Sequence, residues 1–233
     1  MIAKNRVQVF CDGTRISPED FAKIAPEDFA KTEVKVDGKM TKLPERKTLV
    51  MLNKPRGFVS SRNAQTKFAK TLYELLPENF AKLKTVGRLD KDSSGLILLT
   101  DDGDLAQQMT HPSFAKNKTY LVRIDKSLEP LHQQMISDFG VELPDGKSRL
   151  ILTRIERADL SRNDFMALQT EEKADFSSRK FWQVNMSQGK NRQIRRTFEA
   201  LGYEVVRLHR VEFGEYILGD LAPGEVRKIR ELK

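Results

Sequence analysis

Short apolar segments bounded by glycine, proline or aspartate recur along this chain, and most of them have the length of a strand. They predict strands over residues 49–52, 95–100, 119–124, 150–155, 165–169, 181–186, 205–211 and 225–229. Helices are predicted over residues 71–76, 104–109, 128–139 and 191–201. Because strands often follow one another without an intervening helix, the pattern predicts an α+β domain with a mainly antiparallel mixed sheet flanked by helices. The polar stretches 158–163 and 171–178 are predicted to be exposed loops.

Residues 1–45 differ in pattern from the rest and predict a small separate segment, followed by a larger domain over 49–233. Strands at 7–10 and 33–36 each lead into an Asp-Gly turn. Between them, Ser17–Lys23 and Ala25–Lys31 repeat one unit, in which proline and acidic residues predict one or two helical turns. A similar unit recurs at 77–82, but so few short copies do not predict a solenoid.

Charge indicates the class of partner. The chain has 41 Lys+Arg against 33 Asp+Glu, a net charge of +8, which favours a polyanionic partner over a merely solvated basic surface. Cys11 is the single cysteine, which excludes an intrachain disulfide and a thiolate metal cluster. The three histidines, at 111, 132 and 209, lack metal-ligand spacing, so no metal is expected.

Targeting signals are not evident in the sequence. No apolar run approaches the ~20 residues that a membrane helix needs, so no membrane partner is expected. No apolar segment follows Lys4 and Arg6, as it would in a signal peptide. We therefore expect a cytoplasmic protein.

The first candidate site is Gly87-Arg88-Leu89-Asp90, followed by the apolar segment 95–100. This order places Asp90 on a polar turn against a buried strand, where it would be held firmly without being buried itself. An ordinary Asp-rich turn before a core strand is the alternative.

Two further motifs carry candidate chemistry. In Lys118-Thr119-Tyr120, the tyrosine begins a predicted strand and could equally be a core residue with its hydroxyl at the edge. In 189–196, Arg192, Arg195 and Arg196 gather at a predicted helix start. The helix dipole disfavours cations there, so the cluster predicts a carboxylate or phosphate nearby, although a solvated basic turn is the alternative.

Together these motifs resemble those of RsuA-type RNA pseudouridine synthases, over roughly residues 49–230. Smaller matches in the same order are 52–57, His111-Pro112, 208–210 and 221–225. The resemblance implies the pseudouridine synthase fold, in which Asp90 is the catalytic residue, Tyr120 lies over the target base and can transfer a proton, and Arg195 pairs with Asp90. The residues expected to contact substrate or RNA are Arg88, Lys54, Lys118, Lys190, Arg192, Gln193 and Arg196.

The activity implied by this resemblance is isomerisation of a uridine in RNA, most often ribosomal RNA, to pseudouridine. It involves no redox change and no group transfer to a second substrate, so no cofactor is expected, and we expect a monomer. Residues 1–45 weakly resemble the second half of an S4 RNA-binding domain, so a truncated S4-like segment is expected there. A non-catalytic RNA-binding assembly factor of the same fold and a DNA-binding regulator are the alternatives, and release of the C5 proton of uridine discriminates against both.

Overall fold

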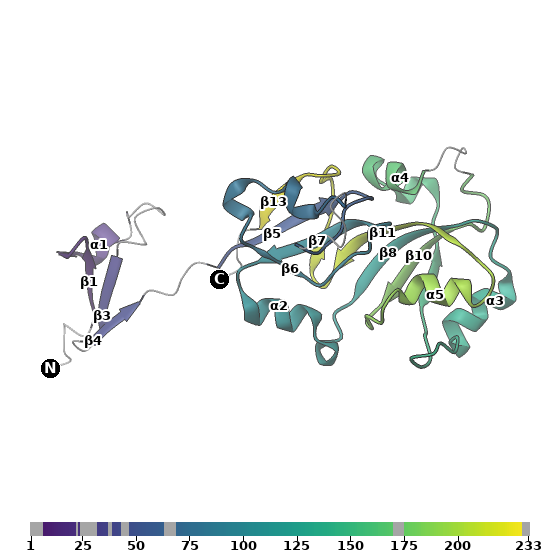
Figure 1. Ribbon diagram of the computed structural model, residues 1–233, viewed down its shortest axis with the longest axis horizontal. Coiled ribbons are helices and arrows are strands. Elements are labelled where there is room, and N and C mark those ends of the chain that lie inside the picture. Colours follow the sequence, from purple (N-terminus) through teal and green to yellow (C-terminus); the bar gives the residue numbers. More distant parts are fainter. Residues whose placement is uncertain are drawn as a thin grey trace. The chain divides into compact units, whose positions relative to one another are not determined.

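The computed structural model describes residues 7–21, 23, 32–36, 39–42, 47–62, 69–169 and 175–229. The chain divides into two compact units, Met1–Arg46 and Lys47–Lys233 (Figure 1). Each unit has a sheet of its own, and the two are described separately.

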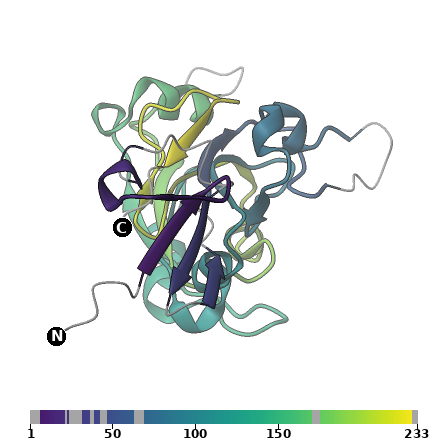
Figure 2. The same cartoon turned by 90° about the vertical axis from the view of Figure 1, so that its left-hand side faces the viewer.

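The N-terminal unit is a four-stranded antiparallel sheet with the order β2-β1-β3-β4 (Figure 2). Its elements are β1 (Val7–Cys11), β2 (Thr14–Ile16), α1 (Pro18–Phe21), β3 (Thr32–Val36) and β4 (Lys39–Lys42). Asp12 and Gly13 both have positive φ, as the tight turn between β1 and β2 requires. The predicted strands and the helical turn of the first repeat are confirmed. The second repeat, 25–31, lies outside the described residues.

The larger unit is built on a nine-stranded sheet. Its main path runs β13-β5-β7-β11-β8-β10-β9, with β12 paired to β11 and β6 paired to β7. The pairing of β7 with β11 is parallel, and the other pairings are antiparallel, which confirms the predicted mixed sheet. The strands are β5 (Leu49–Lys54), β6 (Lys84–Val86), β7 (Ser94–Thr100), β8 (Lys118–Ile124), β9 (Ile151–Arg154), β10 (Phe181–Met186), β11 (Val205–Phe213), β12 (Tyr216–Ile217) and β13 (Val226–Ile229).

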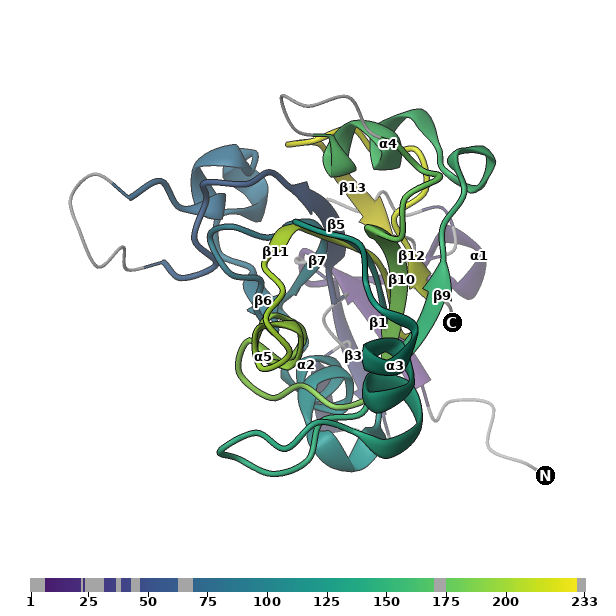
Figure 3. The same cartoon turned by 90° about the vertical axis from the view of Figure 1, so that its right-hand side faces the viewer.

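Both faces of this sheet are apolar, and helices bury them. Side chains of β7 alternate between two clusters, with Ile97 and Leu99 in one and Leu96 and Leu98 in the other. The first cluster includes Phe198 of α5, and Figure 3 views the unit from the end where α3 and α5 lie. The helices are α2 (Gly103–Thr110), α3 (Pro130–Gln134), α4 (Arg162–Leu168) and α5 (Gln193–Glu199), with 3-10 turns at Leu72–Leu75, Glu78–Phe80, Pro112–Phe114 and Arg157–Asp159 and a π turn at Met135–Phe139.

The structure differs from the predicted elements between residues 157 and 169. The segment predicted as a strand over 165–169 belongs to the helix α4. Ser161 caps this helix, since its hydroxyl accepts a hydrogen bond from the Asp164 amide, and Phe165 and Leu168 lie on one face, as residues three apart do. The loop predicted over 158–163 is therefore partly helical. Of the loop predicted over 171–178, only 175–178 lies within the described residues.

Candidate active site

A cavity of about 200 Å³ opens where the turn after β6 meets β8, β11 and the start of α5. Among the described residues, its walls combine apolar and cationic side chains with one carboxylate, that of Asp90. The residues that line it are Gly87, Arg88, Leu89, Asp90, Ser93, Thr110, Lys118, Tyr120, Met186, Gly189, Lys190, Arg192, Gln193, Ile194, Leu208, Arg210 and Phe213.

The turn that carries Asp90 is anchored on both sides. Gly87 has a φ of 72°, a left-handed conformation that suits glycine. The Ser60 hydroxyl donates to the Leu89 carbonyl and accepts from the Leu89 amide, at 2.7 and 3.1 Å. The Ser93 amide closes the turn on the Asp90 carbonyl. Leu89 is thus buried, while the Asp90 side chain remains 37% exposed.

Three cations hold the carbonyl groups that follow Asp90. Lys54 Nζ donates to the Ser93 carbonyl at 2.7 Å, and Arg56 Nε donates to the Asp92 carbonyl at 3.1 Å. Arg195 Nη2 donates to the same Asp92 carbonyl at 3.2 Å. These bonds fix the backbone that presents the Asp90 carboxylate.

Lys54 occupies a different environment from the RNA-facing one expected of it. It is fully buried, and its ammonium also donates to the Pro55 carbonyl at 2.9 Å. Burial lowers the pKa of Lys54 to about 8, against the opposing charges of Asp90 and Asp92. In this structure the ammonium therefore supports the turn, and contact of Lys54 with RNA stays a prediction.

The arginine that pairs with Asp90 is Arg192, and the expected pairing with Arg195 is corrected. Arg192 Nη1 lies 3.2 Å from Asp90 Oδ2. Arg192 has a φ of 47° and precedes the first residue of α5, which brings its side chain to the cavity. Arg195 lies three residues further along and donates instead to the Val205 carbonyl at 2.6 Å. Burial is the main cause that lowers the pKa of Arg195, followed by the charge of Arg192.

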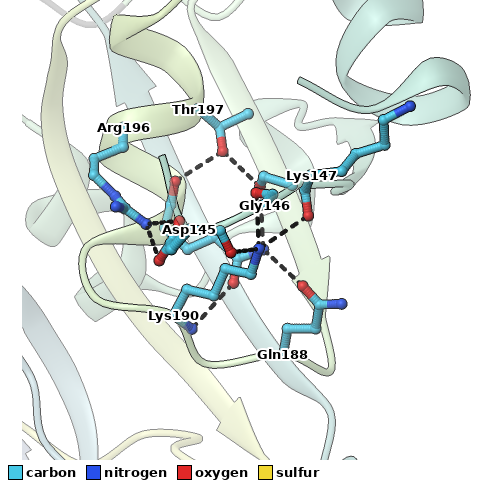
Figure 4. Close-up of polar contacts among 9 residues, drawn as sticks. Asp145, Gly146, Lys147, Gln188, Lys190, Arg196 and Thr197 are labelled. Carbon is cyan, nitrogen blue, oxygen red and sulfur yellow. Dashed lines mark hydrogen bonds and ion pairs between the residues drawn. The ribbon is translucent and has the colours of Figure 1, made fainter. Parts of the chain in front are cut away.

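The remaining polar residues at the start of α5 hold a neighbouring loop (Figure 4). Arg196 Nη2 donates to both carboxylate oxygens of Asp145, at 2.8 and 2.7 Å, and this bond lowers the pKa of Asp145. Lys190 Nζ donates to the carbonyl groups of residues 145, 146 and 147. Gln193 is buried and donates to the Ser148 hydroxyl. These three side chains thus bond to protein groups, and their contact with RNA stays a prediction.

The predicted carboxylate near the arginine cluster is confirmed twice. Asp90 faces Arg192 and Asp145 faces Arg196, so two of the three guanidinium groups have a carboxylate partner. These ion pairs offset the unfavourable interaction of the arginines with the positive end of the helix dipole.

Tyr120, Lys118 and Arg88 also line the cavity with Asp90. Tyr120 is 8% exposed and lies on β8 directly opposite Arg210 of β11, whose Nη1 approaches the phenol oxygen at 3.5 Å. Arg88 is exposed on the turn. Arg210 was not among the predicted site residues. Its presence in the matched segment 208–210, within a predicted strand, was the available signal, since buried arginines need partners.

The described residues also bear on metal sites and membrane-spanning helices. Within the described residues, no group of three or more His, Cys, Asp or Glu could hold a metal ion. No helix in the described part of the chain is long and apolar enough to cross a membrane.

Comparisons with known proteins agree on one family. The family model for RNA pseudouridylate synthase matches residues 48–200. The ribosomal small subunit pseudouridine synthase A of Yersinia pestis is 34% identical over 84% of this chain and 75% of its own length. The ribosomal large subunit pseudouridine synthase E of Xanthomonas campestris is 35% identical over 77% of this chain and 94% of its own length.

A solved structure extends this agreement to the fold. The crystal structure of a pseudouridylate synthase superposes with a TM-score of 0.63 at 28% identity, covering 97% of this chain and 86% of the other. The matched residues 48–200 contain the Asp90 turn, Tyr120 and the start of α5. The chain therefore belongs to the RNA pseudouridine synthases of the RsuA type, isomerases that act on RNA.

Proposed function

We propose that the cavity receives a uridine turned out of an RNA strand, and that Asp90 is the catalytic residue that converts it to pseudouridine. One observation carries the proposal: of the described residues that line this cation-rich cavity, Asp90 alone has a carboxylate. A carboxylate placed at such a cavity can act as a nucleophile or a general base.

The neighbouring side chains suit a displaced base. Taking a base out of its stack costs a few kcal/mol, which phosphate contacts and aromatic packing can offset. In this proposal Tyr120 lies over the uracil ring, and exposed Arg88 faces the RNA. Arg192 orients the Asp90 carboxylate, at an N–O distance of 3.2 Å. Arg195 is a positioning residue, because it acts on Asp90 through the Asp92 carbonyl.

The substrate we infer is ribosomal RNA in the cytoplasm. The names of the two bacterial relatives support this choice, one for each ribosomal subunit. The net charge of +8 suits an RNA partner. We propose further that the unit Met1–Arg46 contributes to RNA binding, and that the protein acts as a monomer without a cofactor.

The test is conversion of ribosomal RNA by the purified full-length protein. Unmodified transcripts of both ribosomal RNAs, made with uridine tritiated at C5, are incubated with the protein, and released tritium is counted. Modified positions are then mapped and compared with those of cells that lack the gene. We expect stoichiometric release from one or a few uridines. Binding of the transcripts without release would support the alternative of a non-catalytic assembly factor.

A further inference from the structure

Arg210 is a buried cation whose hydrogen bonding is incomplete. The residue is 2% exposed, and its Nε donates to the Leu96 carbonyl at 2.7 Å. Nη1 approaches the Tyr120 hydroxyl at 3.5 Å. Nη2 is buried, and no hydrogen-bond acceptor for it is found among the described residues. Leaving a charged donor buried and unsatisfied is costly, so this nitrogen is suited to an acceptor that comes with a ligand.

The fold holds this side chain in the cavity wall. Arg210 pairs with Gly95 of the parallel strand β7 and with Tyr120 of β8. Gly95 has a φ of 104°, and a Cβ atom at this position would overlap the Arg210 backbone. Glycine therefore permits the close approach of the two strands, and the register of β11 places Arg210 at the cavity wall.

Lys118 is a second cation at the same wall. Lys118 Nζ lies 5.4 Å from the centre of the Phe213 ring, and Arg210 Cζ lies 4.9 Å from the same centre. Burial lowers the pKa of Lys118, and the charge of Arg210 lowers it further. The carboxylate that lines the cavity, Asp90, pairs with Arg192 instead. The arrangement thus favours a ligand that brings negative charge to Arg210 and Lys118.

We propose that Arg210, assisted by Lys118, is a catalytic residue that binds a carbonyl oxygen of the uracil ring and stabilises negative charge on it during the reaction. The inference rests on the proposed function. If the C1′–N1 bond breaks first, its electron pair leaves with the uracil and spreads over N1, O2 and O4. If Asp90 adds to C6, the C5=C6 pair moves onto O4. In the first route the Asp90 carboxylate takes up C1′, and in the second the C1′–N1 bond breaks after the addition. In either case C5 then bonds to C1′, Asp90 leaves C1′ or C6 as a carboxylate, C5 loses its proton and N1 gains one, so the ring ends neutral.

This role resembles stabilisation of an oxyanion by a fixed donor in a buried site. The donor contributes most where charge develops, because little water is present to screen it. Loss of one such donor typically lowers the rate by about 10²–10³-fold. Truncation of Arg210 should therefore affect the chemical step more than the binding of RNA, which depends on phosphate contacts.

The test measures single-turnover tritium release by full-length Arg210→Ala and Arg210→Lys on the same transcripts, together with RNA affinity. We expect Arg210→Ala to lower the rate about 10²–10³-fold with little change in affinity, and Arg210→Lys to retain part of the rate. Guanidinium chloride, at concentrations too low to unfold the protein, should restore part of the rate of Arg210→Ala. Urea, which has the same shape without the charge, should not.

Arg123→Ala provides the matched control. Arg123 is a buried arginine of β8 that packs over the Phe181 ring and does not line the cavity. The single-turnover rate of Arg123→Ala, per folded molecule, should not change when guanidinium is added. The inference is overturned if Arg210→Ala keeps the wild-type rate. It is also overturned if guanidinium restores no more of the lost rate than urea does. Inactivity of the wild-type protein would instead refute the proposed function itself.

Discussion

Truncation of Arg195 and of Arg192 should have different consequences, although only three residues separate them. Arg195 donates to the carbonyl groups of Val205 and Asp92, at 2.6 and 3.2 Å. Hydrogen bonds from a charged donor contribute about 1.5–3 kcal/mol each. The Arg195 side chain is only half-buried, and solvent weakens its two bonds. Arg195→Ala should therefore lower the free energy of unfolding by about 2–4 kcal/mol. The Arg192–Asp90 pair is 46% and 37% exposed, and such pairs contribute about 0.2–1 kcal/mol.

The single tryptophan provides the assay. Trp182 is fully buried in the larger unit, so its fluorescence during urea unfolding reports on that unit alone. Free energies of unfolding of wild type, Arg195→Ala and Arg192→Ala are compared in one buffer, with single-turnover rates measured on the same preparations. Arg192→Ala should keep near wild-type stability while its rate falls, because Asp90 loses the partner that orients it.

The contrast is open to refutation from either side. If Arg192→Ala lost more than about 2 kcal/mol of unfolding free energy while Arg195→Ala kept wild-type stability, the assignment would be wrong. Arg192 would then be the structural residue, and Arg195 would not be. A double-mutant cycle with Asp90→Asn adds a second criterion. It should give a coupling energy of at most about 1 kcal/mol between positions 90 and 192.

The remaining predictions concern the turn, the sheet and the N-terminal unit. The pKa of Lys54 is about 8 in the folded protein and about 10.5 in the unfolded chain, so the unfolded chain binds more protons between these pH values. The free energy of unfolding of the wild type, relative to that of Lys54→Met, should therefore rise by up to about 3 kcal/mol from pH 8 to 10.5. Parallel stability curves of the two proteins from pH 7 to 10 would contradict this. Gly95→Ala should destabilise the protein by at least about 2 kcal/mol, because the new Cβ overlaps the backbone of β11, and an unchanged melting temperature would refute the close approach. Deletion of residues 1–46 should weaken RNA affinity but preserve the rate at saturating RNA, whereas a collapsed saturated rate would show that the N-terminal unit is needed for chemistry.

Local pattern was sufficient to predict most strands of the sheet and the position of the Asp90 turn, but it did not predict β6 or β12. The lengths of the strands, the Asp12-Gly13 turn and the strand after Asp90 depend on residues that are close in the sequence. The predicted Asp37-Gly38 turn lies outside the described residues. The helix α4 was mistaken for a strand because its short apolar run fits both periods, and the Ser161 cap was the signal that distinguished them.

Side-chain partners were much less predictable. Lys54, Lys190 and Gln193 were expected to contact RNA, yet each bonds to protein groups that lie far away in the sequence. Which arginine reaches Asp90 depends on the left-handed backbone of Arg192, and no spacing rule contains that information. Arg210 was overlooked because its environment arises from strands that meet only in the folded sheet.

The most direct test of the account is the single-turnover release of tritium by Asp90→Asn. The amide is nearly isosteric with the carboxylate but cannot act as an anion, so folding and RNA affinity should persist. Asp92→Asn, in the same turn, is the matched control, because its side chain is exposed and lies outside the cavity. We predict that Asp90→Asn releases less than about 1% of the wild-type tritium while Asp92→Asn stays active. Release by Asp90→Asn at a rate near that of wild type would contradict the central claim.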